Sequence, residues 1–400
     1  MIIKMAYRNM MRHKRRSLLT ALAMIFGYVL MSISLCVADG MYSNIIDLFT
    51  RNKVGHVQIH FSDYLDNPNL YKTIVENSGI QKVLKAEKKV EAYAPRVYGG
   101  GLSFYKNKSM VVNLIGIDPV LEPKTTTIKD RLLKGEFFKD KNSYEAIIGE
   151  TIAKVLKISI GDKLIVISQG ADASVANDLF IVKGIMPKIE GNTVYVPIGA
   201  LQEFLVLEGK VHEYAVIGKH QKNSKKIVKI LNEKITDKNI DIKPWQIVEK
   251  EFYKAMMADL KGNYFSMVII MIIVALGVLN SILMNVLDRT REFGLIKAMG
   301  TRPSWIFRLI MSEMIILSLV SVATGAVIAT FANYYFVAIG IQYAQPLTYG
   351  GITINSVYGA YTLSSYLEPA LVVLLTTLFV SMYPAVKAAK IIPVKALRAV

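Results

Sequence analysis

Cysteine occurs once in the 400 residues, at Cys36, inside an apolar run. A single cysteine excludes a disulfide framework within the chain, so any domain outside the cytoplasm must be stable through its own hydrophobic core. The sequence has no G-x-x-x-x-G-K-[ST] loop, which excludes the usual backbone cradle for ATP. It also lacks H-E-x-x-H and C-x-x-C motifs, and His56 and His60 have no further candidate ligand nearby. We therefore predict no catalytic residues, no metal site and no cofactor bound by this chain.

Lysine and arginine are absent from residues 340–366, although the formal net charge of the chain is +17. Hydrophobic residues make up 52% of the sequence, and four long apolar runs stand out within it. The runs occupy residues 17–38, 264–287, 309–339 and 367–386. A helix needs about 20 mainly apolar residues to cross a bilayer, so each run is a candidate membrane span.

Outside residues 39–262, the basic residues fall into three clusters at the ends of these runs. They are Lys4, Arg8, Arg12, Lys14, Arg15 and Arg16; Arg289, Arg291, Lys297, Arg302 and Arg308; and Lys387, Lys390, Lys395 and Arg398. Positive residues in short flanks stay on the cytoplasmic side. With four spans, both termini are predicted to be cytoplasmic. Nucleic-acid binding is the alternative for a basic chain, but the charges follow the span ends.

The N-terminal basic cluster admits two interpretations. Residues 8–16 are predicted to form an interfacial helix whose cations could contact anionic lipid headgroups, or they could only set the topology. The basic start, apolar run and Cys36 also resemble a lipoprotein signal. We favour a retained anchor, because the run is long for a signal and Leu35 stands where a small residue is expected.

The polar segment after the first span has the alternation of a mixed α and β domain. Strands are predicted at 56–61, 109–117, 163–168, 180–185 and 214–217. Helices are predicted at 150–156, 197–207 and 222–235. Gly99, Gly100 and Gly101 suggest a bend, bulge or turn. The predicted fold class is an α-helical membrane protein with four transmembrane helices, and an α+β extracytoplasmic domain inserted between the first and second.

Apolar residues keep a helical spacing beyond the end of the first span and before the start of the second span. We predict one helix from about 246 to 287, paired with a helix after Ala38, as a stalk that transmits force or acts as a passive spacer. The predicted organisation runs along the chain as follows: 1–52, interfacial helix, first span and stalk; 53–245, α+β domain; 246–288, stalk and second span; 289–308, cytoplasmic segment; 309–339, third span; 340–366, extracytoplasmic loop; 367–400, fourth span and basic tail.

Polar and small residues inside the third span point to helix contacts. Glu313 is costly in a span unless it is paired or lies near water, and Arg308, Arg302 or another basic group of residues 289–308 could pair with it. It could act as a hinge pin or be a solvated interfacial carboxylate. Ser321, Gly325 and Ala329 repeat small residues every four positions, which allows close helix packing.

Four blocks together resemble the FtsX/MacB-type permeases of ABC transporters, including the lipoprotein-releasing, LolC/LolE-like branch. The blocks are YRNMMRHKRRSLLTAL at 7–22, LGVLNSILMNVLDRTREFGLIKAMGTRPSWI at 276–306, SEMIILSLVSVATGAVIA at 312–329, and YPAVKAAKIIPVKALR at 383–398. They occur in the order and spacing of that family. Residues 55–60 and 116–119 favour the lipoprotein-releasing branch, whereas Glu292-Phe293-Gly294 is closer to the macrolide-exporter pattern.

The resemblance implies a permease subunit of the bacterial inner membrane that does not hydrolyse ATP itself. A separate cytoplasmic ATPase dimer would bind ATP and Mg²⁺, and a second permease would complete the dimer. The family's coupling segment maps onto a set of residues expected to dock the ATPase, with the Phe293 ring inserted into its groove. The set is Arg289, Arg291, Glu292, Phe293, Gly294, Lys297, Met299 and Gly300.

The resemblance also implies mechanotransmission, in which ATP-driven closure moves the extracytoplasmic domain and a lipoprotein is extracted from the outer leaflet to a periplasmic acceptor. Acyl chains would then meet apolar residues at the outer ends of the first two spans, although such residues are commonly mere lipid or helix contacts. They are Leu35, Ala38, Met41, Ile45, Tyr264, Phe265 and Val268. The alternatives are an efflux permease of a MacB-like tripartite system and an FtsX-like transducer that controls a cell-wall hydrolase.

Overall fold

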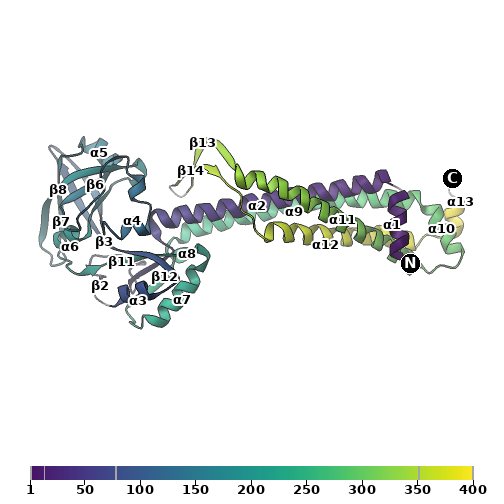
Figure 1. Ribbon diagram of the computed structural model, residues 1–400, viewed down its shortest axis with the longest axis horizontal. Coiled ribbons are helices and arrows are strands. Elements are labelled where there is room, and N and C mark those ends of the chain that lie inside the picture. The colour runs from purple at the N-terminus through teal and green to yellow at the C-terminus, as the bar shows by residue number, and fades with distance from the viewer. Residues whose placement is uncertain (1, 13, 77–78, 350–351, 399–400) are drawn as a thin grey trace. The chain divides into compact units, whose positions relative to one another are not determined.

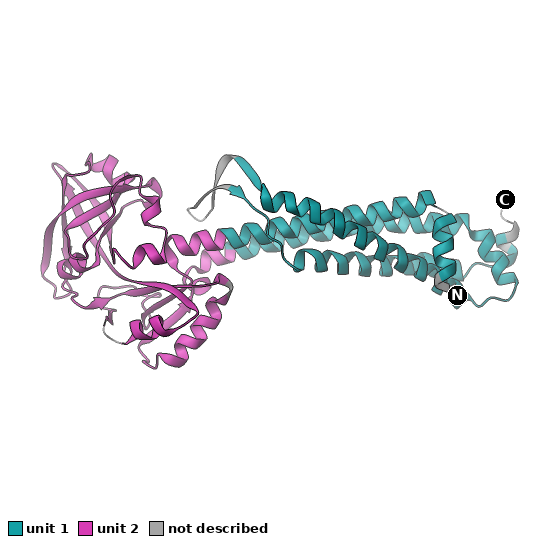
Figure 2. Ribbon diagram, viewed as in Figure 1, with its two compact units in different colours: residues 1–44, 255–347, 354–400 teal, residues 45–254, 348–353 magenta. Residues whose placement is uncertain are grey.

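The computed structural model describes residues 2–12, 14–76, 79–349 and 352–398, which form two compact units. The helical unit comprises residues 1–44, 255–347 and 354–400, and the α+β unit comprises residues 45–254 and 348–353 (Figure 2).

The helical unit contains helices long and apolar enough to cross a membrane. Among the described residues, the four candidate spans are Lys14–Val54, Lys250–Asp288, Pro303–Ala338 and Ser364–Ala389. Its helices, in chain order, are α1 (Ile2–Arg12), α2 (Lys14–Phe49), α9 (Lys250–Asp288), α10 (Thr290–Ala298), α11 (Pro303–Ala338), α12 (Ser364–Ala389) and α13 (Pro393–Arg398) (Figure 1). Together with the α+β unit between α2 and α9, they confirm the predicted fold class.

The core of the helical unit is built where α2, α9, α11 and α12 turn apolar faces toward one another. Met24 and Tyr28 of α2, Val278 of α9 and Val373 of α12 are almost fully buried in one cluster. The small-residue repeat of α11 lies in this packing, because Ser321, Gly325 and Ala329 are all buried. A Cβ placed on Gly325 would lie 2.9 Å from Cδ1 of Tyr28, so α2 and α11 approach closely at this glycine.

The α+β unit is organised around one ten-stranded sheet. Its strand order is β12-β1-β11-β3-β4-β9-β6-β8-β5, and β7 pairs with β3 and β8. The strands are β1 (Val57–Phe61), β3 (Val90–Tyr105), β4 (Lys108–Ile117), β5 (Lys134–Gly135), β6 (Glu145–Gly149), β7 (Lys163–Gln169), β8 (Val175–Met186), β9 (Thr193–Pro197), β11 (Glu213–Gly218) and β12 (Ile240–Pro244). The short pair β2 (Ile74–Val75) and β10 (Lys210–Val211) forms a separate ladder.

Short helices pack apolar residues against this sheet. They are α3 (Ile80–Ala86), α4 (Glu122–Thr125), α5 (Glu150–Leu156), α6 (Ile198–Phe204), α7 (Ser224–Lys234) and α8 (Trp245–Val248). Ile152 of α5, Leu201 of α6 and Ile227 of α7 are fully buried in the main cluster. The strands predicted from alternation and the three predicted helices are confirmed, with ends that shift by a few residues.

Two predictions about local structure are wrong. Gly99–Gly101 do not form a bend, because they lie inside β3 and pair in register with Leu114, Asn113 and Val112 of β4. Gly99 and Gly101 allow close approach instead, since a Cβ on Gly99 would lie 2.7 Å from Cδ1 of Leu205 and a Cβ on Gly101 would lie 2.9 Å from the Ile167 carbonyl oxygen. The segment 340–366, interpreted as a loop, contains two paired strands, β13 (Ile341–Tyr349) and β14 (Ile352–Val357).

The predicted long helix around the second span is present but begins later than expected. β12 ends at Pro244, α8 covers one turn, and Glu249 leaves helical geometry with φ −108° and ψ 58°. α9 then runs without a break from Lys250 to Asp288. At the end of α2, the chain continues through a π-helical turn, Thr50–Val54, which stops at Gly55 with φ +80°.

Candidate coupling site

The connection between α9 and α11 folds into a short helix that its own sequence delimits. Arg289 leaves helical geometry between α9 and α10, and Gly300 ends the α10 turn with φ +89°. Glycine favours this left-handed position because it has no Cβ. Pro303, whose fixed φ suits the first turn of a helix, starts α11.

A buried ion pair fixes the start of this segment to α11. Arg289 Nη1 lies 3.2 Å from both carboxylate oxygens of Glu313, and both side chains are less than a tenth exposed. Asn9 Nδ2 of α1 donates to Glu313 Oε1 at 2.7 Å. Of the partners predicted for Glu313, the basic group of the connecting segment is the one observed, and it is Arg289 instead of Arg302 or Arg308. Three elements, α1, α10 and α11, therefore meet at one carboxylate.

Arg289 has further partners on α10. Its Nε donates to Glu292 at 3.1 Å, and its guanidinium lies 4.8 Å from the centre of the Phe293 ring. A guanidinium over an aromatic face is attracted by the ring quadrupole. Arg289 therefore holds the first turn of α10 in place as well as neutralising Glu313.

Phe293, which was expected to insert into a groove of the ATPase, is fully buried in the core of the helical unit, so in this structure its ring offers no free surface to a partner. Gly294 is buried beside it, and a Cβ at Gly294 would lie 2.6 Å from the Cβ of Ala396 on α13. The C-terminal helix α13 thus packs against α10 at Gly294, one of the residues expected to dock the ATPase. No local sequence signal predicts this contact, because Gly294 and Ala396 lie about 100 positions apart.

Lys297 also forms hydrogen bonds within the chain. Its Nζ donates to the carbonyls of Ala389 at 2.9 Å and Ile391 at 2.8 Å, which satisfies carbonyls where α12 ends. The exposed apolar side chains of the segment are instead Leu295, at 54%, and Met299, at 72%. Leu295 was missed by the sequence analysis, whereas Met299 belongs to the predicted set. Arg291 and Gly300 are exposed as well.

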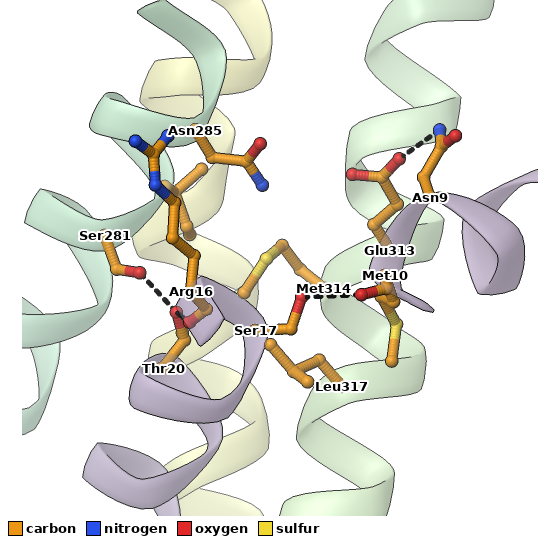
Figure 3. A pocket seen from close by; sticks show the side chains of 11 residues that line it. Asn9, Met10, Arg16, Ser17, Thr20, Ser281, Asn285, Glu313, Met314 and Leu317 are labelled. Atoms are coloured by element: carbon orange, nitrogen blue, oxygen red, sulfur yellow. Dashed lines mark hydrogen bonds between the residues drawn. The ribbon is translucent and has the colours of Figure 1, made fainter. Parts of the chain in front are cut away.

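A small polar cavity lies beside the ion pair, between α1, α2, α9 and α11 (Figure 3). Its volume is about 20 Å³, which is room for one water. Thr20 and Ser281 share a hydrogen bond across α2 and α9, and Ser17 Oγ donates to the Met10 carbonyl at 3.2 Å. Arg16 forms an ion pair with Asp288 at the end of α9. Polar contacts thus link all the helices around the coupling segment.

The residues proposed to meet acyl chains do not share one environment. Leu35 and Ile45 are buried, at 4% and 2% exposure, so they offer no free surface to a substrate. Ala38 and Met41 are half-buried. Tyr264, Phe265 and Val268 are exposed on α9, as are Ile269 and Ile273 farther along it. Of the residues predicted to meet acyl chains, those on α9 are therefore the exposed ones.

An ionic cluster in the α+β unit was also missed. Arg96 of β3 is buried and binds Glu122 at 2.7 Å and Glu213 at 3.0 Å, and it donates to the Lys53 carbonyl in the π-helical turn that follows α2. Tyr98 donates to Glu213 at 2.8 Å. Burial, followed by the charge of Glu213, raises the pKa of Tyr98 well above its usual value. This cluster attaches the π-helical turn to the sheet through Arg96. No sequence motif predicts it.

Three buried histidines of the α+β unit are His56, His60 and His212. His56 Nδ1 accepts from the Gly218 backbone at 3.0 Å, and His60 Nε2 lies 2.9 Å from Gln58 Oε1. Within the described residues, no group of three or more His, Cys, Asp or Glu side chains is placed to hold a metal ion. Burial lowers the pKa of both histidines, so both rings are held neutral.

Comparison with known proteins divides the chain into two regions. Residues 17–233 match the MacB-like periplasmic core domain, and residues 264–393 match the FtsX-like permease C-terminal region. The chain is 23% identical to the macrolide export ATP-binding/permease protein MacB of Campylobacter jejuni over 98% of its length and 60% of that protein. The chain thus spans less than two thirds of this relative.

Two further relatives differ in how much of their length matches. The first matches over almost its whole length, and the second matches over less than half. An ABC transporter permease of Methanocaldococcus jannaschii is 21% identical over 99% of this chain and 97% of its own length. The lipoprotein-releasing system transmembrane protein LolC of Buchnera aphidicola is 27% identical, but over only 39% of this chain and 41% of that protein.

Proposed function

Since the chain belongs to the MacB-like periplasmic core domain family and continues into an FtsX-like permease region, we propose that it is the membrane subunit of an ABC transporter. In this role it is a multi-pass protein of the bacterial inner membrane with both termini in the cytoplasm. A separate ATPase dimer binds ATP and Mg²⁺ and docks on α10, and a second permease subunit, identical or different, completes the assembly.

The observation that carries this proposal is the arrangement of α10. It joins two candidate spans, it exposes Leu295 and Met299, and it is fixed to α11 through the buried Arg289–Glu313 pair. A partner that pushes on the exposed side chains would move α10 and α11 together, because the pair is buried and hydrogen-bonded on several sides. Mechanical coupling requires a rigid link between α10 and α11, and the buried ion pair provides one.

Lipoprotein extraction from the outer leaflet is the substrate role that we propose. The exposed apolar side chains of α9, including Tyr264, Phe265 and Val268, provide a surface that acyl chains could follow. The periplasmic acceptor would then receive the lipoprotein without transfer of the substrate across the bilayer. The partial match to LolC supports this role.

Efflux is the second candidate, and the comparisons give it specific support. The match to MacB extends over almost the whole chain, whereas the match to LolC covers well under half. An efflux role would require a periplasmic adaptor and an outer channel. It uses the same α10 docking surface, so the substrate and the periplasmic partners distinguish the two proposals.

The test is ATPase capture and stimulation in lipid nanodiscs, using the cognate ABC ATPase. We expect Leu295→Asp and Met299→Asp each to weaken ATPase binding by about 30-fold, because truncating or charging a buried anchor of an interface costs about 2 kcal/mol or more. Val175→Asp, at an equally open site in the α+β unit (79% exposed), is the matched control and should bind normally.

The substrate arms use a triacylated lipoprotein and a macrolide with the wild-type complex. Stimulation of ATP hydrolysis by lipoprotein alone supports extraction, and stimulation by the macrolide alone supports efflux. Normal ATPase capture with no response to either would favour an FtsX-like transducer. If both α10 variants capture the ATPase as well as wild type, the docking proposal is wrong.

A further inference from the structure

A second, larger cavity opens where α1 meets α2. Its volume is about 430 Å³, and it is lined by Met11, Arg12, Lys14, Arg15, Arg16 and Asp288. Four of these side chains are cationic and one is anionic, so the lining carries a formal charge of +4 − 1 = +3. An excess of this size attracts an anion, since exposed like charges otherwise repel one another.

The cations of this cavity are unequally neutralised. Arg16 forms an ion pair with Asp288, and Arg12 approaches Glu292 at 3.8 Å with its side chain 76% exposed. Within the part of the chain that the structure describes, Lys14 and Arg15 have neither a hydrogen bond nor an ion pair through their side chains. Two cations therefore remain available to an external anion.

The surroundings of the cavity suit an anion that carries apolar chains. On α1, Tyr7 and Met11 are exposed apolar side chains beside the exposed cations of the same helix. Directly after the cavity, α2 presents Leu18, Leu19 and Leu22 at 59%, 66% and 49% exposure. A headgroup on Lys14 and Arg15 would thus have apolar surface for its acyl chains within the next two turns of α2.

We propose that this cavity binds the phosphodiester headgroup of an anionic phospholipid. Lys14 and Arg15 neutralise the phosphate, and the exposed leucines of α2 accompany the acyl chains. Free phosphate shares the headgroup chemistry but gains nothing from the apolar surface. Basic pockets next to span ends are suited to such headgroups.

The test measures retained lipid on the full-length protein by native mass spectrometry. The protein is reconstituted in phosphatidylcholine nanodiscs with and without phosphatidylglycerol, and affinity is taken from the titration with phosphatidylglycerol. The double variant Lys14→Gln/Arg15→Gln should bind phosphatidylglycerol about 20- to 30-fold more weakly than wild type. The matched control is Lys387→Gln/Lys390→Gln, which removes two exposed cations from the end of α12.

Three outcomes would overturn the proposal. In the first, the double variant binds phosphatidylglycerol as tightly as wild type. In the second, the control loses as much affinity for phosphatidylglycerol as the double variant, which would attribute the effect to net charge. A third arm adds inorganic phosphate to wild type. Displacement of phosphatidylglycerol by phosphate at comparable concentration would show that the site takes free phosphate. Unchanged thermal unfolding of both variants shows that the comparison is between folded proteins.

Discussion

Glu313 is the residue on which the coupling segment depends most directly. It lies in a span, where an unpaired carboxylate is expensive, and it is satisfied by Arg289 and Asn9. Replacing one partner of a buried pair leaves the other charge without compensation. Breaking the pair is therefore costly, and this cost keeps α10 in a fixed position relative to α11.

We expect Glu313→Ala to lower the free energy of unfolding by about 3 kcal/mol, because removing one partner of a buried ion pair typically costs about 3–5 kcal/mol and Glu292 still contacts Arg289. The measurement is denaturant unfolding in detergent. Glu251→Ala is the matched control, since Glu251 pairs with Lys254 while 86% exposed, and such a surface pair contributes at most about 1 kcal/mol. Equal losses in the two variants would contradict the assignment.

His212 makes the stability of the α+β unit depend on pH. Its Nδ1 accepts from the Tyr98 backbone at 3.1 Å and its Nε2 lies 3.2 Å from the Leu70 carbonyl, an arrangement that suits the neutral ring. Burial lowers the pKa of His212 to about 4, with His60 as a further unfavourable neighbour. The unfolded chain therefore binds more protons than the folded chain between the ordinary histidine pKa and about pH 4.

Stability is expected to fall as the pH is lowered from about 6.5 toward 4, by about 3 kcal/mol from this group, at 1.36 kcal/mol per pKa unit. Thermal unfolding of the wild type at a series of pH values measures the slope. His212→Asn should reduce the slope over that window and leave the part that comes from His56 and His60, whereas His220→Asn, at an exposed position, should leave it unchanged. A slope that His212→Asn leaves unchanged would assign the effect to other groups.

At the scale of elements, close packing of α11 against α2 depends on one missing Cβ. Gly325 lies against the Tyr28 ring, whereas a Cβ on Gly277 of α9 would meet only Ala23 at 3.8 Å, an ordinary contact. Alanine improves helix propensity by about 1 kcal/mol at either site. The difference between the two substitutions therefore isolates the steric effect of the α2–α11 contact.

Gly325→Ala is expected to destabilise the protein by about 1–3 kcal/mol, the usual cost of overpacking a core. Gly277→Ala should be neutral or slightly stabilising. Thermal unfolding of both variants in the same detergent measures the difference. If Gly325→Ala is as stable as Gly277→Ala, the helices have room to separate, and the small-residue repeat does not fix their distance.

Element types were predictable where a local signal determined them. Apolar length predicted the four candidate spans. Alternation predicted strands such as β4 and β7. It missed that Gly99–Gly101 stay in β3, because the role of Gly99 is set by Leu205, which is distant in the sequence.

At the scale of the whole molecule, the coupling segment shows where prediction from sequence stops. The motif placed the coupling segment between two candidate spans, where the structure has the short helix α10. It could not show which face is covered, since burial of Phe293 depends on α13 and the role of Lys297 depends on the end of α12. Leu295 and Met299 emerge as the accessible apolar pair only when those distant contacts are known.

The close contact between Gly294 and Ala396 has an evolutionary consequence. A single heavy atom added to Gly294 would meet the Ala396 side chain at 2.6 Å, so the two positions share a fixed volume. Among related chains, we expect these positions to covary, with any gain in side-chain size at one accompanied by a small residue at the other. The coupling helix and the C-terminal helix are thus expected to have diverged as a matched pair.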